Sequence, residues 1–494
     1  MVAGVKTVGQ AALIARFELN RPAPFVTSTV GPGSRSTRIE GGRRFEHYTR
    51  AYDPGDSVAG HLRFALRYEP LDIGILVAVM QALDPEEIRG WVLAEPNGQY
   101  ARRAWFFYEW ATGVQLDLPD AGVVRYVPAL LPAFHITARG QKSPRHKVED
   151  NLLGTRAFCP TVRRTQAIED AVARGLAARG RAVLQTCAPD VLARAVNYLF
   201  TKETRTSFEI EHETPSSEKA QRFVQSLQLA ENLSLDRIED LVKLQGQIVD
   251  PRYAAKGLRN FQNFVGETIG FDYAEHVHFI CPRPEDIADL MAGWQEMSGR
   301  LVDDIDPVIA AALVAFGFVF LHPFEDGNGR IHRFLIHKVL SDRAFTPPGM
   351  LFPVSAAILR DRHGYDHCLE AFSGAIAPHI RWAWGAEKTL LVQNETADLY
   401  RYFDATAQVE YLFDRIENTI EVDLRQELDF ITRFDQALQA LRQVIDMPDR
   451  RARLFTQLVL QNAGQLSKAK RNQFGELSDD EVTAMEAAIR AAVE

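Results

Sequence analysis

The spacing of apolar and polar positions predicts helices along most of the chain. Residues 308–321 are apolar throughout, and Asp306-Pro307 before them supplies the aspartate cap and first-turn proline of a helix start. Because this stretch is shorter than the roughly 20 residues of a membrane span, we predict a buried helix. Amphipathic spacing after residue 400 predicts further helices, and Ser478-Asp479-Asp480-Glu481 marks the start of the last.

Two shorter patterns predict other elements. Residues 71–83 and 100–112 have helical spacing, and the second stretch is rich in aromatic residues. Helices packed by aromatic side chains favour a packing domain, although they also fit a winged-helix-like module whose Arg102 and Arg103 face a partner. Residues 264–279 alternate apolar and polar positions around a glycine-containing turn, which predicts a β-hairpin.

Length and punctuation predict several parts in a mainly α fold. At 494 residues the chain exceeds the roughly 250–300 residues that one core supports. The first of the expected parts, rich in Gly, Ser and Arg, is a partly disordered N-terminal segment. The expected parts are residues 1–50 (this segment), 51–165 (a helical module and connector), 166–390 (a central domain) and 391–494 (a C-terminal helical region).

Composition narrows the class of protein. A hydrophobic content of 46% with 24% charged residues is typical of a soluble globular chain, and the net charge of −9 argues against a nucleic-acid binder as a whole. The four cysteines show no CxxC spacing, so we expect a reducing cytoplasm. We interpret the histidines that lack metal-ligand spacing as ordinary surface or core residues. These are His332, His337, His363 and His367.

The segment 322–333, HPFEDGNGRIHR, holds the main candidate chemistry. Gly327 and Gly329 allow positive φ, which can aim successive backbone N–H groups into one concavity. A helix that starts near Asn328 adds the positive end of its dipole at the same place. The sequence therefore predicts an anion site at this loop.

Four charged or titratable side chains indicate that the anion is the phosphate group of a nucleotide. Arg330 and Arg333, three residues apart, can fork onto phosphate oxygens. Asp326 beside them would repel phosphate unless a cation intervenes, which implies Mg²⁺. His322 follows the buried helix and suits proton transfer near neutral pH. Together these groups predict group transfer from a nucleotide to a hydroxyl.

The segment is similar to the core motif of the Fic family, HPFx(D/E)GNGRxxR, and satisfies every specified position. The resemblance covers residues 196–378 and implies a Fic-type helical core. It implies transfer of AMP from ATP to a Ser, Thr or Tyr hydroxyl of a target protein, with pyrophosphate leaving. Carried over by position, His322 resembles the general base and Asp326 the Mg²⁺ ligand. Gly327-Asn328-Gly329 resembles the cradle for the α- and β-phosphates.

Further positions follow from the same resemblance. Arg330 and Arg333 look like the contacts to the β- and γ-phosphates. The hairpin at residues 264–279 looks like the family's flap, which clamps the target by strand addition. Tyr365 stands where the family often places a residue near the nucleotide base.

A second motif predicts autoinhibition. Many Fic proteins carry (S/T)xxxE(G/N), whose glutamate pairs with the second motif arginine and misplaces the γ-phosphate. Ser207 and Glu211 match it here, in a helix expected near residues 195–212, so the resemblance implies inhibition through a Glu211–Arg333 pair. His212 departs from the usual glycine or asparagine, and histidine tolerates the left-handed helix end less well.

Alternative functions stay open at this point. The same site could remove AMP, with Glu211 positioning water, or transfer another nucleotide. A non-enzymatic nucleotide-sensing regulator is a third reading, which the intact His322 disfavours. The expected partners are ATP and a hydroxyl-bearing target protein, with self-modification and a homodimer left open; no membrane is expected.

Overall fold

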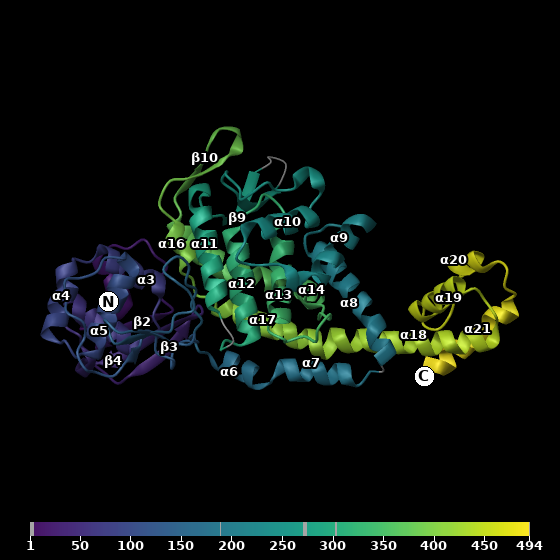
Figure 1. Cartoon of the computed structure of the whole chain (residues 1–494), viewed down its shortest axis with the longest axis horizontal. Coiled ribbons are helices and arrows are strands. Elements are labelled where there is room, and N and C mark those ends of the chain that lie inside the picture. The colour runs from purple at the N-terminus through teal and green to yellow at the C-terminus, as the bar shows by residue number, and fades with distance from the viewer. Residues whose placement is uncertain (1–3, 188, 270–273, 302–303, 494) are drawn as a thin grey trace.

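The structure is a computed structural model that describes residues 4–187, 189–269, 274–301 and 304–493. It is mainly helical with small sheets, as predicted. Figure 1 shows an N-terminal part in purple, a central helical body, and a yellow C-terminal group beyond the long helix α18 (Arg425–Val444). Within the described residues, every helix is too short or too polar to cross a membrane.

The N-terminal part begins with a four-stranded sheet in the order β1-β2-β4-β3. Strands β2 and β4 are parallel and the other neighbours antiparallel. The strands are β1 (Lys6–Val8), β2 (Val26–Gly31), β3 (Ser36–Glu40) and β4 (Arg43–Thr49). We predicted partial disorder for residues 1–50, whereas residues 4–50 are instead folded. Val8, Val30 and Tyr48 form a small core with Phe64. The spacing of neighbouring residues does not predict this core, because its members lie far apart along the chain.

Five helices complete the core of this part. They are α1 (Gly9–Arg16), α2 (Val58–Tyr68), α3 (Ile73–Ala82), α4 (Pro85–Ala94) and α5 (Gln99–Thr112). The structure buries Arg102 and Arg103 instead of presenting them to a partner: they are 3% and 1% exposed. Arg102 Nη1 donates to Lys147 O at 2.7 Å and Arg103 Nη1 to Leu66 O at 2.6 Å. Arg102 therefore holds the connector after α5, and Arg103 ties α5 to α2.

The connector after α5 contains a second small sheet in the order β5-β7-β6. Its strands are β5 (Val127–Pro128), β6 (Gln141–Ser143) and β7 (Val148–Asp150). Strand β7 pairs parallel with β5 and antiparallel with β6. The expected surface connector is thus partly built into a sheet.

The central body packs around helix α12 (Pro307–Leu321), whose residues 308–321 are all buried, as predicted. Asp306 caps it, accepting a hydrogen bond from Val308 N at 2.8 Å. Its neighbours include α13, which follows the 322–327 loop and packs along α12. The other central helices are α6 (Gln166–Ala173), α7 (Leu176–Gln185), α8 (Pro189–Ile210), α9 (Ser217–Gln228), α10 (Ile238–Ile248), α11 (Pro284–Arg300), α13 (Asn328–Asp342), α14 (Val354–Arg360), α15 (Arg362–Ile376), α16 (Ala397–Arg401) and α17 (Thr406–Asn418).

Two hairpins lie at one end of this body, at the top of Figure 1. Strands β8 (Phe264–Ile269) and β9 (Ala274–Ile280) form the predicted antiparallel hairpin, which we call the flap hairpin. Strands β10 (Trp382–Trp384) and β11 (Leu390–Val392) form the other. The tip of the flap hairpin, residues 270–273, lies outside the described residues.

The boundary between the central body and the C-terminal region lies further along the chain than expected. Helix α17 continues through η6 (Thr419–Leu424) into α18, and apolar residues up to Ile431 belong to the central core. A separate core begins at Ala437. It joins the end of α18 to α19 (Asp449–Gln461), η7 (Asn472–Phe474) and α21 (Asp479–Val493), while α20 (Lys468–Arg471) lies between α19 and η7. The structure therefore places the division inside α18 and not at residue 390.

Candidate active site

The loop between α12 and α13 brings the predicted site residues together. His322 ends α12 in the left-handed conformation with φ 49°, and Gly327 precedes α13 with φ 88°. Asn328 closes the loop from within: its Oδ1 accepts from Phe324 N at 3.1 Å and its Nδ2 donates to Phe324 O at 2.8 Å. The side chain of Asn328 thus fixes the shape of the loop. The groups of this loop that could bind an anion are therefore its backbone N–H groups.

His322 is held as a neutral imidazole. Its Nδ1 lies 3.3 Å from Val319 O, so a proton on Nδ1 leaves the Nε2 lone pair free to accept one. Burial, reinforced by the charge of Arg259, lowers the pKa of His322 to about 4. Arg259 Nε also donates to His322 O at 2.8 Å and fixes this turn. The arrangement suits a general base.

Both motif arginines are buried, each with a side chain 1% exposed. Arg330 Nη2 donates to Asp326 Oδ1 at 2.8 Å and its Nη1 to Glu213 Oε2 at 3.2 Å. Arg330 Nε and Arg333 Nη1 have no hydrogen-bond partner among the described residues. Buried donors without acceptors are costly, so both arginines are suited to receive the oxygens of a phosphate group.

Asp326 fits the role of a Mg²⁺ ligand in its chemistry. Its carboxylate is 52% exposed at the rim of the loop, beside the arginines. Carboxylate oxygens are the ligands that Mg²⁺ prefers, usually together with substrate phosphates. Asp326 Oδ1 also accepts from Gly327 N at 2.6 Å, which orients the side chain toward the start of α13.

Helix α8 delivers Glu211 to Arg333, the pairing that the second motif predicts. Arg333 Nη2 donates to Glu211 Oε1 at 2.8 Å, and Arg333 Nε donates to Ser207 Oγ at 2.9 Å. Although burial opposes it, Arg333 holds the pKa of Glu211 below its usual value, so the pair is ionised. A Cβ on Gly329 would lie 2.2 Å from Glu211 Oε1, and only glycine leaves room for this contact.

His212 adopts the conformation that the motif reserves for glycine or asparagine. Its φ of 56° lies in the left-handed region, two residues after Ile210, where α8 ends. The departure from the motif therefore leaves the helix end in the expected shape, with the local strain of a non-glycine residue in this region.

Tyr365 lies in the core and not at an open surface. It is 6% exposed and makes ring contacts with His332 and Tyr411, each with centroids 6.1 Å apart. Burial raises the pKa of Tyr365, and the nearby Arg333 partly offsets that rise. The structure places this residue against the second motif arginine; its predicted closeness to a nucleotide base stays a prediction.

Three residues of the site were missed in the sequence. Arg259 braces His322, Glu213 contacts Arg330, and Gln245 Nε2 donates to Asp326 O at 3.2 Å. Glu213 stands in the same glutamate-rich stretch as Glu211, which could have drawn attention to it. Arg259 and Gln245 carry no local motif, because they act on backbone atoms far away along the chain.

Part of the chain is similar to known proteins. The model of the Fic/DOC family matches residues 233–340. The chain is 28% identical over 180 residues to the protein adenylyltransferase Fic of Nematostella vectensis, covering 35% of this chain and 37% of that protein. It is 34% identical over 180 residues to the same-named protein of Drosophila willistoni, covering 35% and 32%.

A solved Fic family protein from Desulfovibrio desulfuricans G20 aligns with 60% of this chain and 88% of its own, at 18% identity and a TM-score of 0.36. Residues 233–340 form a Fic domain. The chain spans about a third of the length of the curated relatives it matches. The matched residues include the 322–327 loop, Arg259 and the flap hairpin, whereas Ser207 and Glu211 lie before them.

Proposed function

We propose that the protein transfers AMP from ATP to a hydroxyl side chain of a target protein and releases pyrophosphate. One observation carries the proposal: a neutral imidazole, His322, stands beside a glycine-flanked helix start where Arg330 and Arg333 keep buried donors that find no partner in the described part of the chain. The names of the relatives support the same reaction.

The chemistry follows from these groups. His322 Nε2 takes the proton of the target hydroxyl, and the oxygen forms a bond to the α-phosphorus while the bond to pyrophosphate breaks. Arg330, Arg333 and the amide groups at the start of α13 offset the charge of the leaving phosphates. Asp326 would hold Mg²⁺, whose charge adds to theirs.

We further propose that Glu211 restrains this activity. Its contact with Arg333 occupies the guanidinium and adds negative charge where phosphate oxygens need positive charge. The Ser207 hydroxyl and carbonyl hold Arg333 from the same helix, and so they keep it turned toward α8. A ligand that displaces Glu211 must replace a charge-assisted hydrogen bond, typically about 1.5–3 kcal/mol.

The test uses ATP labelled on either the α- or the γ-phosphate. We expect protein-bound label from the α position, raised at least about tenfold in Glu211→Gly and less in Ser207→Ala, because about 1.4 kcal/mol is tenfold in rate. Glu209→Gly, an exposed glutamate on the same helix, is the matched control for the glycine substitution.

His322→Ala in the Glu211→Gly background should lower the labelling by about 10²–10⁴-fold, the usual contribution of a general base. Label from the γ position alone would replace the proposal with phosphate transfer. No label from either position in any variant would leave a nucleotide-sensing regulator. Equal labelling in Glu211→Gly and Glu209→Gly would contradict the proposed inhibition by Glu211 but not the proposed transfer of AMP.

A further inference from the structure

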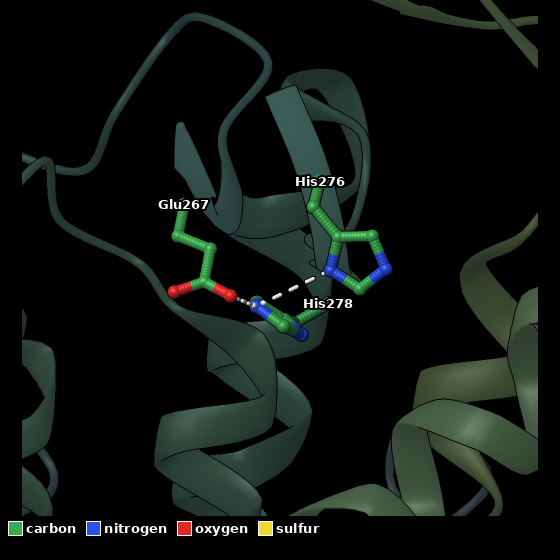
Figure 2. Close-up of side chains that lie close together, drawn as sticks. All are labelled: Glu267, His276 and His278. Atoms are coloured by element: carbon green, nitrogen blue, oxygen red, sulfur yellow. Dashed lines mark hydrogen bonds and ion pairs between the residues drawn. The ribbon is translucent and has the colours of Figure 1, made fainter. Parts of the chain in front are cut away.

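The flap hairpin carries a cluster of metal-ligand side chains apart from the Mg²⁺ position. Glu267 of β8 and His276 and His278 of β9 place their ligand atoms within 4.8 Å of one another. Figure 2 shows the carboxylate and the two imidazoles gathered on one side of the hairpin. Among the described residues this is the one group of at least three such side chains that meets that distance.

The strand geometry explains the cluster. His276 and His278 are two residues apart on one strand, so their side chains leave the same face of the hairpin. Glu267 is the register partner of His276 across the pair of strands. Cross-strand neighbours lie close enough for their side chains to interact, so the backbone presents all three ligands together.

The distances match a small tetrahedral ion. Glu267 Oε1 lies 3.5 Å from His278 Nε2, and His276 Nδ1 also lies 3.5 Å from His278 Nε2. Ligand atoms at about 2.0–2.1 Å from a tetrahedral Zn²⁺ are separated by about 3.3 Å. Closing two of the three gaps therefore takes only small side-chain rotations, which these exposed side chains can make: that of Glu267 is 64% exposed and that of His278 41%.

We propose that Glu267, His276 and His278 form a Zn²⁺ site on the flap hairpin, with water at the fourth position. Two imidazoles and one carboxylate suit Zn²⁺ and its neighbours in the first transition row. Mg²⁺ prefers all-oxygen ligands in an octahedron, so this site and the Asp326 position select different ions.

The site would act as a staple between the two strands. One ligand comes from β8 and two from β9, so bound Zn²⁺ joins the strands through side chains alone. The backbone N–H and C=O groups at the hairpin edges stay free to pair with another strand. A more ordered hairpin would then present the target more firmly, a consequence that rests on the proposed transfer function; the Zn²⁺ site itself does not.

The experiment titrates Zn²⁺ into the full-length, untagged and metal-stripped protein in excess Mg²⁺, and calorimetry measures the binding. Co²⁺ as a substitute reports imidazole coordination through its visible absorption. The variants are Glu267→Gln and the double variant His276→Ala/His278→Ala. The matched control, His363→Ala/His367→Ala, removes two exposed histidines from α15.

We expect one Zn²⁺ per chain in the wild type and the control, and binding at least about tenfold weaker in both cluster variants. Zn²⁺ should also slow hydrogen exchange of the hairpin amides in residues 264–267 and 276–280, in the wild type but not in the double variant. Binding that is equal in the double variant and the wild type, or absent in the wild type, overturns the proposal. Neither outcome bears on labelling from ATP, so the two proposals fail separately.

Discussion

Two regions of the molecule each hold a glutamate–histidine pair, and burial separates their roles. Where α8 meets the central body, Glu203 Oε1 lies 2.8 Å from His337 Nε2, with side chains 1% and 6% exposed. On the flap hairpin, Glu267 Oε1 lies 3.5 Å from His278 Nε2, and the side chains are 64% and 41% exposed. The same two residue types thus occupy opposite dielectric environments.

The difference shows what each pair can do. Glu203 also accepts from Ser355 N at 2.9 Å and from the Ser355 hydroxyl, so two donors of Ser355 face its buried carboxylate. Although burial opposes it, these partners hold the pKa of Glu203 below its usual value. Such a pair fixes α8, and with it Glu211, in one position. The exposed pair fixes little and is free to bind something else.

The largest expected effect comes from breaking the buried pair. Glu203→Ala leaves the backbone N–H and the hydroxyl of Ser355 without their acceptor, and each buried donor left unsatisfied costs about 1–3 kcal/mol. Urea unfolding followed by fluorescence should show this loss, and labelling from ATP should rise because α8 loosens. Glu209→Ala, exposed on the same helix, should change stability by less than about 0.5 kcal/mol. Equal losses in both variants would contradict a fixing role for the buried pair.

A smaller effect concerns pH and the core beside the site. Burial lowers the pKa of His332 to about 3, and its ring packs against Phe316 with centroids 4.6 Å apart. An unfolded histidine takes up a proton below about pH 6.5, so acid favours the unfolded state between pH 6.5 and 3. His332→Phe should reduce this dependence by up to about 1.4 kcal/mol per pH unit.

Unfolding free energies measured at a series of pH values check this expectation. A slope in His332→Phe equal to that of the wild type would show that other groups carry the acid sensitivity.

The smallest effect is expected on the flap hairpin. Without divalent metal, Glu267→Gln should shift the free energy of unfolding by less than about 0.5 kcal/mol, because a contact between exposed polar side chains contributes little. Thermal unfolding in a chelator measures it. A loss comparable to that of Glu203→Ala would mean that exposure does not distinguish the two pairs.

Much of the candidate site could be predicted because its signals are local. The loop residues His322 and Asp326 lie in one short segment, and the Ser207–Glu211 spacing places both on one turn of a helix. The two buried arginines on α5 show the limit of such reasoning. Their charge suggested a partner surface, but their donors satisfy backbone carbonyls that come together only in the folded chain.

The sequence by itself determined the motif loop at residues 322–327, the buried helix before it, the flap hairpin and the likeness of Glu211 to an inhibitory residue. Each depends on neighbours a few positions apart, where backbone periodicity and glycine freedom act directly. Only the tertiary structure decided the N-terminal sheet, the bracing of His322 by Arg259, and which glutamate–histidine pair is buried. Those features join distant segments, and burial is a property of the packed chain rather than of a residue type.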